Sequence, residues 1–348
     1  MTQARAANTG VEVRWQAGTL EVPGNAGPLA LRQCQPVSQA VCAQVVIAAA
    51  IGVPQRFYAV FAQWLAAHGY AVTTFDYRGH AESLHGPLRQ ARADLRDWAV
   101  DCAAVAQHVR AQAPGLPVLW VGHSVGAQLP GMSAQPLPID GMLCVASGSG
   151  YWRDNAPPTR RKVLLWWYGI APLLTALHGC LPGRHWGLVG DLPAGVLWQW
   201  RQWCLHPNYG IGVVGEPLRT AYAAARYPLH AFSIDDDEMM SWRSTTSLVS
   251  WYRHCPSRVE RLHAVHVPAG RIGHFGFFRA EMEGTLWPRA LAVLERWRDR
   301  AQAMTPRGQP YPERRSTVTK MDPGAGSPQP GQGELFSETA CYEHPASP

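Results

Sequence analysis

The sequence is poor in charge and in lysine, and it lacks the motifs of several protein classes. Only 16% of its 348 residues are charged, against roughly 25% in an average soluble domain. The 47% of apolar residues are enough for a sizeable core. Lys162 and Lys320 are the only lysines among 31 basic residues, and the arginines are mostly dispersed. Because no basic stripe, zinc-finger motif or aromatic RNA-binding motif is present, we expect no nucleic-acid partner.

Disulfide and metal-binding patterns are also missing. The eight cysteines are scattered without a Cys-x-x-Cys pair, and several stand inside apolar runs. This pattern favours buried thiols in a reducing compartment. No apolar run follows Arg5, so we expect no secretory signal and a cytoplasmic protein. No motif calls for a metal or a cofactor.

Apolar runs alternate with helical patterns along most of the chain. Strand-like runs bounded by turn residues alternate with apolar residues at three- and four-residue steps, which predicts an α/β protein. Its mostly parallel sheet should carry helices on both faces. The predicted strands are 11–15, 29–33, 45–50, 71–75, 118–121, 142–146, 229–234 and 259–267, and the predicted helices are 57–68, 95–109 and 286–300.

Two segments interrupt the alternation, so we divide the chain into four parts. Residues 1–150 and 228–303 form the two parts of the α/β core, and 151–227 form a helical insertion. Residues 304–348, rich in Pro, Gly, Ser and charge, are predicted to be a disordered tail. The insertion carries seven of the 15 tryptophans. They fit either the core of the insertion or an apolar pocket, and the sequence does not separate these uses.

The insertion contains 21 residues without charge, 163–183, behind the basic run 160–162. Such a run resembles a membrane span with a positive flank. Gly169 and Pro172 break it midway, however, and we favour a hydrophobic cap over the carboxyl edge of the sheet. This interpretation leaves room for contact between the cap and a membrane surface.

A nucleophile motif follows the predicted strand 118–121. Residues 122–126 read Gly-His-Ser-Val-Gly, the G-x-S-x-G pattern in which a serine occupies a strained turn between a strand and a helix. Since glycine is frequent in this chain, with 33 residues, the position after a buried strand carries more weight than the pattern. The motif predicts Ser124 as a nucleophile.

Further motifs make the sequence resemble the α/β-hydrolase superfamily. Residues 75–79 (Phe-Asp-Tyr-Arg-Gly) look like its Asp-x-Arg-Gly turn, and 272–278 (Ile-Gly-His-Phe-Gly-Phe-Phe) look like its histidine loop. With 52–58 (Gly-Val-Pro-Gln-Arg-Phe-Tyr), they are most similar to a bacterial branch near the serine-aminopeptidase-like and lysophospholipase-like hydrolases. The resemblance covers roughly residues 45–300, and a second glycine of the Asp-x-Arg-Gly turn is replaced by Ala81.

The resemblance implies a catalytic triad. Ser124 would be the nucleophile and His274 its base, because His274 follows the last strand and completes the chain order Ser, acid, His. The acid would come from residues 235–238, which follow the strand 229–234. The usual register falls on Asp237, with Asp236 as the alternative. Four adjacent acids repel each other when buried, so most should face water or cap the next helix.

The resemblance also implies two backbone donors for the oxyanion. One would be the amide of Val125, and the other that of Ile51, with Gly52 the neighbouring candidate. Ala49 and Ala50 replace the His-Gly of many relatives. Pro130 interrupts the helix expected behind the nucleophile, where an interior proline costs about 3 kcal/mol.

These residues predict a serine hydrolase that cleaves an ester, or less readily an amide, with an apolar acyl or aryl group through an acyl-enzyme. An acyltransferase with the same triad and a non-catalytic binding protein of the same fold are the alternatives. The expected partner is a small apolar ester or acyl substrate, and the oligomeric state stays open.

Overall fold

The computed structural model describes residues 2–5, 10–186 and 190–304. The predicted disordered tail, 304–348, therefore lies outside the described residues except for Met304, which ends the last helix.

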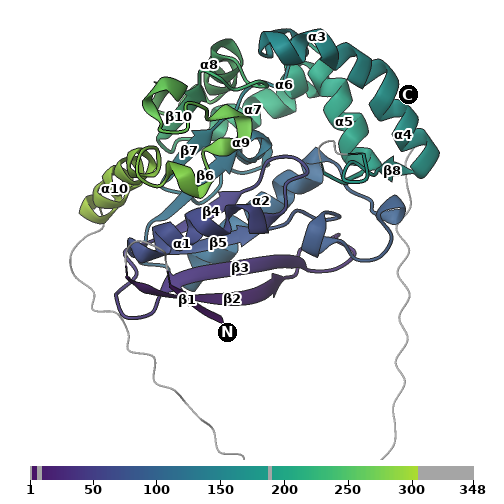
Figure 1. The fold of residues 1–348 in the computed structure, drawn as a ribbon. Coiled ribbons are helices and arrows are strands. Elements are labelled where there is room, and N and C mark those ends of the chain that lie inside the picture. Colours follow the sequence, from purple (N-terminus) through teal and green to yellow (C-terminus); the bar gives the residue numbers. More distant parts are fainter. Residues whose placement is uncertain (1, 6–9, 187–189, 305–348) are drawn as a thin grey trace, which may run out of the picture. The chain divides into compact units, whose positions relative to one another are not determined.

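A nine-stranded sheet forms the centre of the protein (Figure 1), and its strands follow the order β1-β2-β3-β5-β4-β6-β7-β10-β11. The strands from β5 to β11 pair in parallel, and β1, β2 and β3 add antiparallel pairs at one side. The predicted mostly parallel sheet is confirmed. Its strands are β1 (Thr2–Arg5), β2 (Glu12–Leu20), β3 (Leu29–Pro36), β4 (Ala43–Ala48), β5 (Tyr70–Phe75), β6 (Val118–His123), β7 (Gly141–Val145), β10 (Leu229–Ile234) and β11 (Ser257–Leu262).

The central strands are apolar because both faces of the sheet are covered. Every residue of β4, β5, β6 and β10 is buried, as expected for a parallel sheet with helices on both sides. The last strand ends at Leu262, five residues earlier than predicted, because the backbone N–H of Ala264 donates to the Asp235 carboxylate instead of to a neighbouring strand.

Helices of the core pack against the sheet. The start of α10 contacts α1, where the ring centroids of Trp287 and Phe61 are 5.2 Å apart. The helix α2 begins at a capping box made by Asp94 and Asp97, which satisfies backbone N–H groups of its first turn. These helices are α1 (Ala59–Ala67), α2 (Leu95–Gln112), α8 (Trp242–Trp251), α9 (Gly273–Gly276) and α10 (Trp287–Met304).

The segment between β7 and β10 forms a helical insertion, here called the cap, whose helices gather above the sheet in Figure 1. A π turn over Trp166–Ile170 joins its first two long helices. The elements of the cap are α3 (Pro157–Leu165), α4 (Ala171–His178), α5 (Ala194–Leu205), α6 (Tyr209–Val214), α7 (Glu216–Ala224) and the short strands β8 (Cys180–Leu181) and β9 (Leu192–Pro193).

The uncharged run 163–183 lies within this cap. It covers the end of α3, the π turn, α4 and β8, and the chain turns at Gly179, whose φ is +70°. In the part of the chain that the structure describes, no helix combines the length and apolar character that crossing a bilayer requires.

The tryptophans of the cap divide between two environments. Trp203 is buried in the cap core, where its ring contacts that of Tyr209 at 5.5 Å. Trp186 and Trp198 are 53% and 40% exposed. Trp166, Trp167 and Trp200 are described below, because they line a cavity.

Candidate active site

Ser124 occupies a strained turn at the end of β6. Its φ is +52°, a left-handed value that non-glycine residues adopt rarely and that clusters at active sites. The two glycines of the motif make this turn sterically feasible. A Cβ atom on Gly122 would lie 2.6 Å from the backbone nitrogen of Ala127, and one on Gly126 would lie 2.3 Å from the carbonyl oxygen of Ala48.

The chain behind Ser124 does not form the expected α-helix. Two short 3₁₀ turns, Ser124–Ala127 and Leu129–Met132, take its place, with Pro130 in the first turn of the second. Tyr222 and Tyr252 supply hydrogen bonds in place of a longer helix. The Tyr222 hydroxyl donates to the carbonyl of Gln128 over 2.9 Å. The Tyr252 hydroxyl donates to that of Ala127 over 2.8 Å and accepts from the N–H of Gly131.

Asp237 and His274 lie together beside this turn. The Nδ1 of His274 is 2.9 Å from one carboxylate oxygen of Asp237 and 3.1 Å from the other. Both residues are buried, with 4% of Asp237 and 2% of His274 exposed. The backbone N–H groups of Met239 and Met240 also donate to Asp237. The carboxylate is thus fixed from two sides and holds one ring nitrogen of the histidine.

The other three acids of the run have separate partners. Asp236 accepts from the backbone N–H groups of Ile272 and Gly273, each over 2.9 Å, and so anchors the histidine loop. It forms no hydrogen bond with the His274 ring within the described residues. Glu238 accepts from the backbone N–H of His274 over 3.1 Å.

Asp235 pairs with the His263 side chain and accepts from the backbone of Ala264. Of the four acids only Asp237 is buried, whereas Asp235 is exposed and Asp236 and Glu238 are half-buried. Neighbouring backbone N–H groups satisfy their carboxylates, and because successive side chains point in different directions, the charges do not share one site.

His123 links two loops of the site, a role that the sequence motifs did not predict. Its Nε2 lies 3.0 Å from the carbonyl oxygen of His274, which can only accept, so Nε2 carries the proton. The hydroxyl of Tyr58 therefore donates to Nδ1 over 2.8 Å and accepts from the N–H of Ala50. Burial, and to a lesser extent the neighbouring His274, lowers the pKa of His123 well below its usual value and keeps the ring neutral. The only sequence signal for this role is the position of His123 inside the G-x-S-x-G motif.

The loop after β4 contributes Ile51 to the surroundings of Ser124. The N–H of Ala50 is occupied by Tyr58, and Gly52 packs against the cap, since a Cβ atom there would lie 2.7 Å from the nitrogen of Gly190. Ile51, between them, lines a small cavity of about 20 Å³ together with Ser124, Val125 and His274. The structure therefore brings all five predicted site residues together, with Asp237 behind His274.

A family model described as serine aminopeptidase, S33, matches residues 39–268. The chain belongs to this family. The match contains Ser124 and Asp237 and ends before His274. No curated protein sequence matches the chain.

Solved structures share the fold of this S33-family hydrolase at low sequence identity. A lipase in its open form has a TM-score of 0.54 at 16% identity, with 83% of this chain and 99% of the lipase covered. An esterase of Pyrococcus furiosus has a TM-score of 0.53 at 12% identity, with 85% of this chain and 95% of the esterase covered. A membrane phospholipase A, described as a bacterial virulence factor, has a TM-score of 0.50 at 14% identity, with 82% of this chain and 87% of the phospholipase covered. The family and the fold identify a serine hydrolase of the α/β-hydrolase type.

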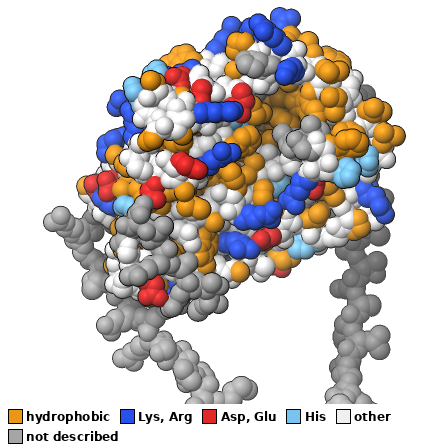
Figure 2. Space-filling view, in the orientation of Figure 1, with side chains coloured by type: hydrophobic (Ala, Val, Ile, Leu, Met, Phe, Trp, Pro, Cys, Tyr) orange, Lys and Arg blue, Asp and Glu red, His pale blue; other side chains and the backbone are white. Residues whose placement is uncertain are grey.

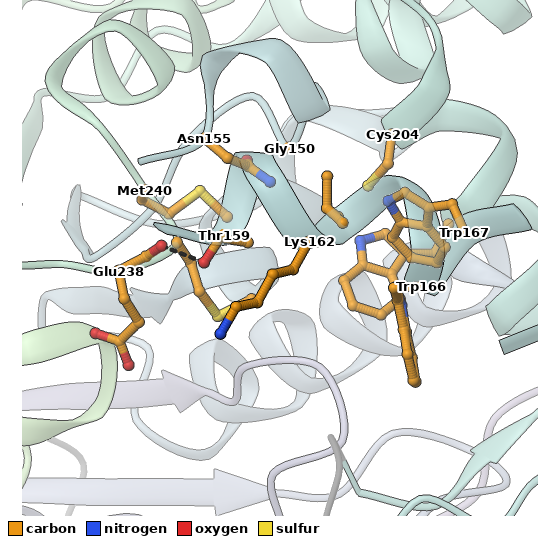
Figure 3. A pocket seen from close by; sticks show the side chains of 12 residues that line it. Gly150, Asn155, Thr159, Lys162, Trp166, Trp167, Cys204, Glu238 and Met240 are labelled. Carbon is orange, nitrogen blue, oxygen red and sulfur yellow. Dashed lines mark hydrogen bonds between the residues drawn. The ribbon is translucent and has the colours of Figure 1, made fainter. Parts of the chain in front are cut away.

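A second and larger cavity lies under the cap of this hydrolase (Figure 3). Its volume is about 430 Å³, and it shares Gly150, Trp200, Met239 and Met240 with the small cavity at Ser124. Trp166 and Trp167 line its far part near Cys204. Burial raises the pKa of the Cys204 thiol well above its usual value, so this cysteine contributes an apolar surface.

Polar side chains line the opposite part of the large cavity. Figure 3 shows Glu238 and Thr159 there, with the Thr159 hydroxyl donating to the backbone carbonyl of Glu238, and the Lys162 side chain extending toward the same side. Because Glu238 also accepts from the His274 backbone, this part of the cavity adjoins the histidine loop. Within residues 2–5, 10–186 and 190–304, no three His, Cys, Asp or Glu side chains gather as a metal site.

Proposed function

We propose that Ser124, His274 and Asp237 act as the catalytic triad of an esterase that forms an acyl-enzyme. The observation that carries the proposal is the pairing of His274 Nδ1 with a buried carboxylate while His274 and Ser124 line one cavity. With Nδ1 held by Asp237, the other ring nitrogen is left to take the proton of the serine hydroxyl.

The reaction would proceed in two halves at the small cavity. The Ser124 oxygen attacks the ester carbonyl, His274 takes the serine proton, and the same proton then passes to the departing alcohol. Water attacks the acyl-enzyme with His274 again as base, which releases the acid and restores the serine. The N–H groups of Val125 and Ile51 would donate to the oxygen that becomes negative in each half.

The acyl or aryl group of the substrate would occupy the large cavity under the cap. Its lining by Trp166, Trp167 and Trp200 fits an apolar group, and the small cavity has room for little more than one water molecule. The two cavities meet at Met239 and Met240, whose flexible side chains adapt to different shapes. The carbonyl would thus sit at Ser124 with the apolar group beyond the methionines.

We also propose that the enzyme acts in the cytoplasm. All seven cysteines within the described ranges are free thiols, and six of them are buried, which fits a reducing compartment.

A fluorophosphonate probe and a panel of p-nitrophenyl esters test the proposal. We expect the probe to label the wild-type protein and not Ser124→Ala, because only an activated serine reacts with it. Labelling that persists in Ser124→Ala would refute the nucleophile assignment.

The ester panel runs from acetate to dodecanoate, beside an amino-acid p-nitroanilide as the amide. We expect kcat/KM to rise with chain length up to the capacity of the large cavity, and to be lower for the amide. A profile that peaks at acetate would contradict an apolar acyl pocket, and faster cleavage of the anilide would assign the site to amides instead.

A further inference from the structure

The outer surface of α3 and α4 is apolar and exposed. Leu165, Tyr168, Leu173 and Leu177 are between 60% and 70% exposed, and together they are here called the outer face. Leu165 and Tyr168 are three residues apart, and Leu173 and Leu177 are four apart, as expected along one side of a helix. The five-residue step between the middle two falls across the π turn, whose wider turn accommodates one extra residue.

The inner side of the same helices is apolar too. Val163, Trp167 and Ala171 are buried there against the cap core and the large cavity. A surface helix normally places polar residues opposite its buried side, and a helix that is apolar all round requires a second apolar environment. The outer face therefore has the composition of a contact surface rather than that of a solvated one.

Basic residues stand beside the outer face. Arg160 and Arg161, in the preceding turn of α3, are exposed and form no ion pair with any described residue, whereas Lys162 extends into the large cavity. Residues 151–227 hold eight Lys and Arg against three Asp and Glu, and thus account for most of the net charge of +6. Figure 2 shows hydrophobic side chains gathered over the part of the molecule where Figure 1 places α3, α4 and α5, with Lys and Arg side chains along its upper rim.

We propose that the outer face docks on the surface of an anionic lipid bilayer. The axes of α3 and α4 would lie along the membrane plane, with the leucines among the upper acyl chains and the arginines on the phosphates of the headgroups. An apolar side flanked by unpaired cations is the pattern that such interfacial helices share. No helix has to cross the bilayer in this arrangement.

Two other occupants fit the face less well. A second copy of the chain would bring two basic clusters to the same interface, and no acidic cluster of the cap is present to complement them. The segment 305–348 has few large apolar side chains, with Leu335 and Phe336 the only adjacent pair. Neither supplies both the apolar surface and the negative charge that the face would pair with.

Co-sedimentation of the full chain with vesicles tests this proposal without reference to catalysis. We expect binding to vesicles of phosphatidylcholine with phosphatidylglycerol, and binding about tenfold weaker to phosphatidylcholine alone. The triple variant Leu165→Ser/Leu173→Ser/Leu177→Ser should bind the anionic vesicles at least about tenfold more weakly. Arg160→Gln/Arg161→Gln should weaken binding about tenfold and flatten its dependence on salt.

The matched control is Val100→Ser/Val265→Ser, which removes two apolar side chains that are 50% and 80% exposed outside the cap. It should bind as the wild type does, and the thermal unfolding midpoint of each variant checks that it folds. Equal losses in the control and the triple variant, or binding that neither cap variant weakens, would overturn the proposal. A dimer in vesicle-free solution that the triple variant dissociates would assign the face to a second copy instead.

Discussion

The Ser124 site and the cap above it are held together by different forces. At the site, directional hydrogen bonds occupy both carboxylate oxygens of Asp236 and both ring nitrogens of His123. In the cap, by contrast, the buried Nε1 of Trp167 and the buried hydroxyl of Thr175 find no partner within the described residues. Ring packing replaces hydrogen bonds there, as between Trp167 and Trp200 at 4.8 Å.

The difference separates chemistry from specificity. Hydrogen bonds have narrow distance and angle limits, so the site tolerates little change in the positions of its reacting groups. Apolar packing is non-directional, so the cap can change the shape of its cavity at a smaller cost. We therefore expect substitutions at the site to act on kcat for every substrate, and substitutions in the cap to act on KM for particular substrates.

The largest expected effect comes from Asp237→Asn. An amide at this position holds the wrong tautomer of His274, and comparable changes in triads lower kcat by about 10³- to 10⁴-fold. Asp236→Asn keeps the His274 ring partner and weakens only two backbone contacts of its loop, so we expect a loss of less than about a hundredfold. Steady-state kinetics on one p-nitrophenyl ester compare the two. If Asp236→Asn were the more damaging variant, the acid assignment would be off by one residue.

A smaller effect is expected from Trp166→Ala in the large cavity. Removing this ring should raise KM for decanoate by about tenfold, because apolar contact area is lost, and should leave kcat/KM for acetate within about twofold. Trp186→Ala is the matched control, since Trp186 is exposed and does not line the cavity. An equal loss on acetate and decanoate would show that the cap also positions the reacting groups, and would break the separation drawn above.

The smallest effect concerns pH and His123. The folded protein lowers the pKa of His123. Below about pH 6.5 this histidine is therefore protonated in the unfolded chain and still neutral in the folded chain. Stability should be fully present above that pH and should fall as the pH drops, by up to about 1.4 kcal/mol per pH unit.

Chemical unfolding of the wild type and of His123→Gln between pH 7.5 and 5 measures this slope. Glutamine offers a donor and an acceptor without titrating, so the slope should decrease by about one proton. His178→Gln, an exposed histidine of α4, serves as the same substitution in the cap. If the dependence of stability on pH is unchanged in His123→Gln, His123 is not the group whose lowered pKa causes it.

Local patterns account for the parts of the fold that the sequence predicts correctly. The runs 45–50, 71–75, 118–121 and 229–234 are continuous and apolar because both faces of the sheet are covered, and each falls on a strand or within two residues of one. The position of Ser124 follows from two glycines whose spacing the turn itself requires.

Contacts between distant residues account for what the sequence could not predict. The links through His123 join residues 65 and 151 positions apart, and no local pattern encodes them. Pro130 indicates an interrupted helix. It does not indicate that the hydroxyl of Tyr252, more than a hundred positions later, donates a hydrogen bond to the backbone there. The partners of Asp236 are likewise backbone groups of a loop 36 positions away.

The two short turns behind Ser124 also change the electrostatics of the site. A long α-helix that begins at the nucleophile carries a macrodipole equivalent to about half a positive charge at its first turn. Four residues of 3₁₀ structure, followed by a second 3₁₀ turn of four residues, sum fewer peptide dipoles than a long α-helix does. Negative charge that forms at Ser124 must therefore be stabilised by individual N–H groups at short range, so that the position of one amide counts for more here than the direction of a whole helix.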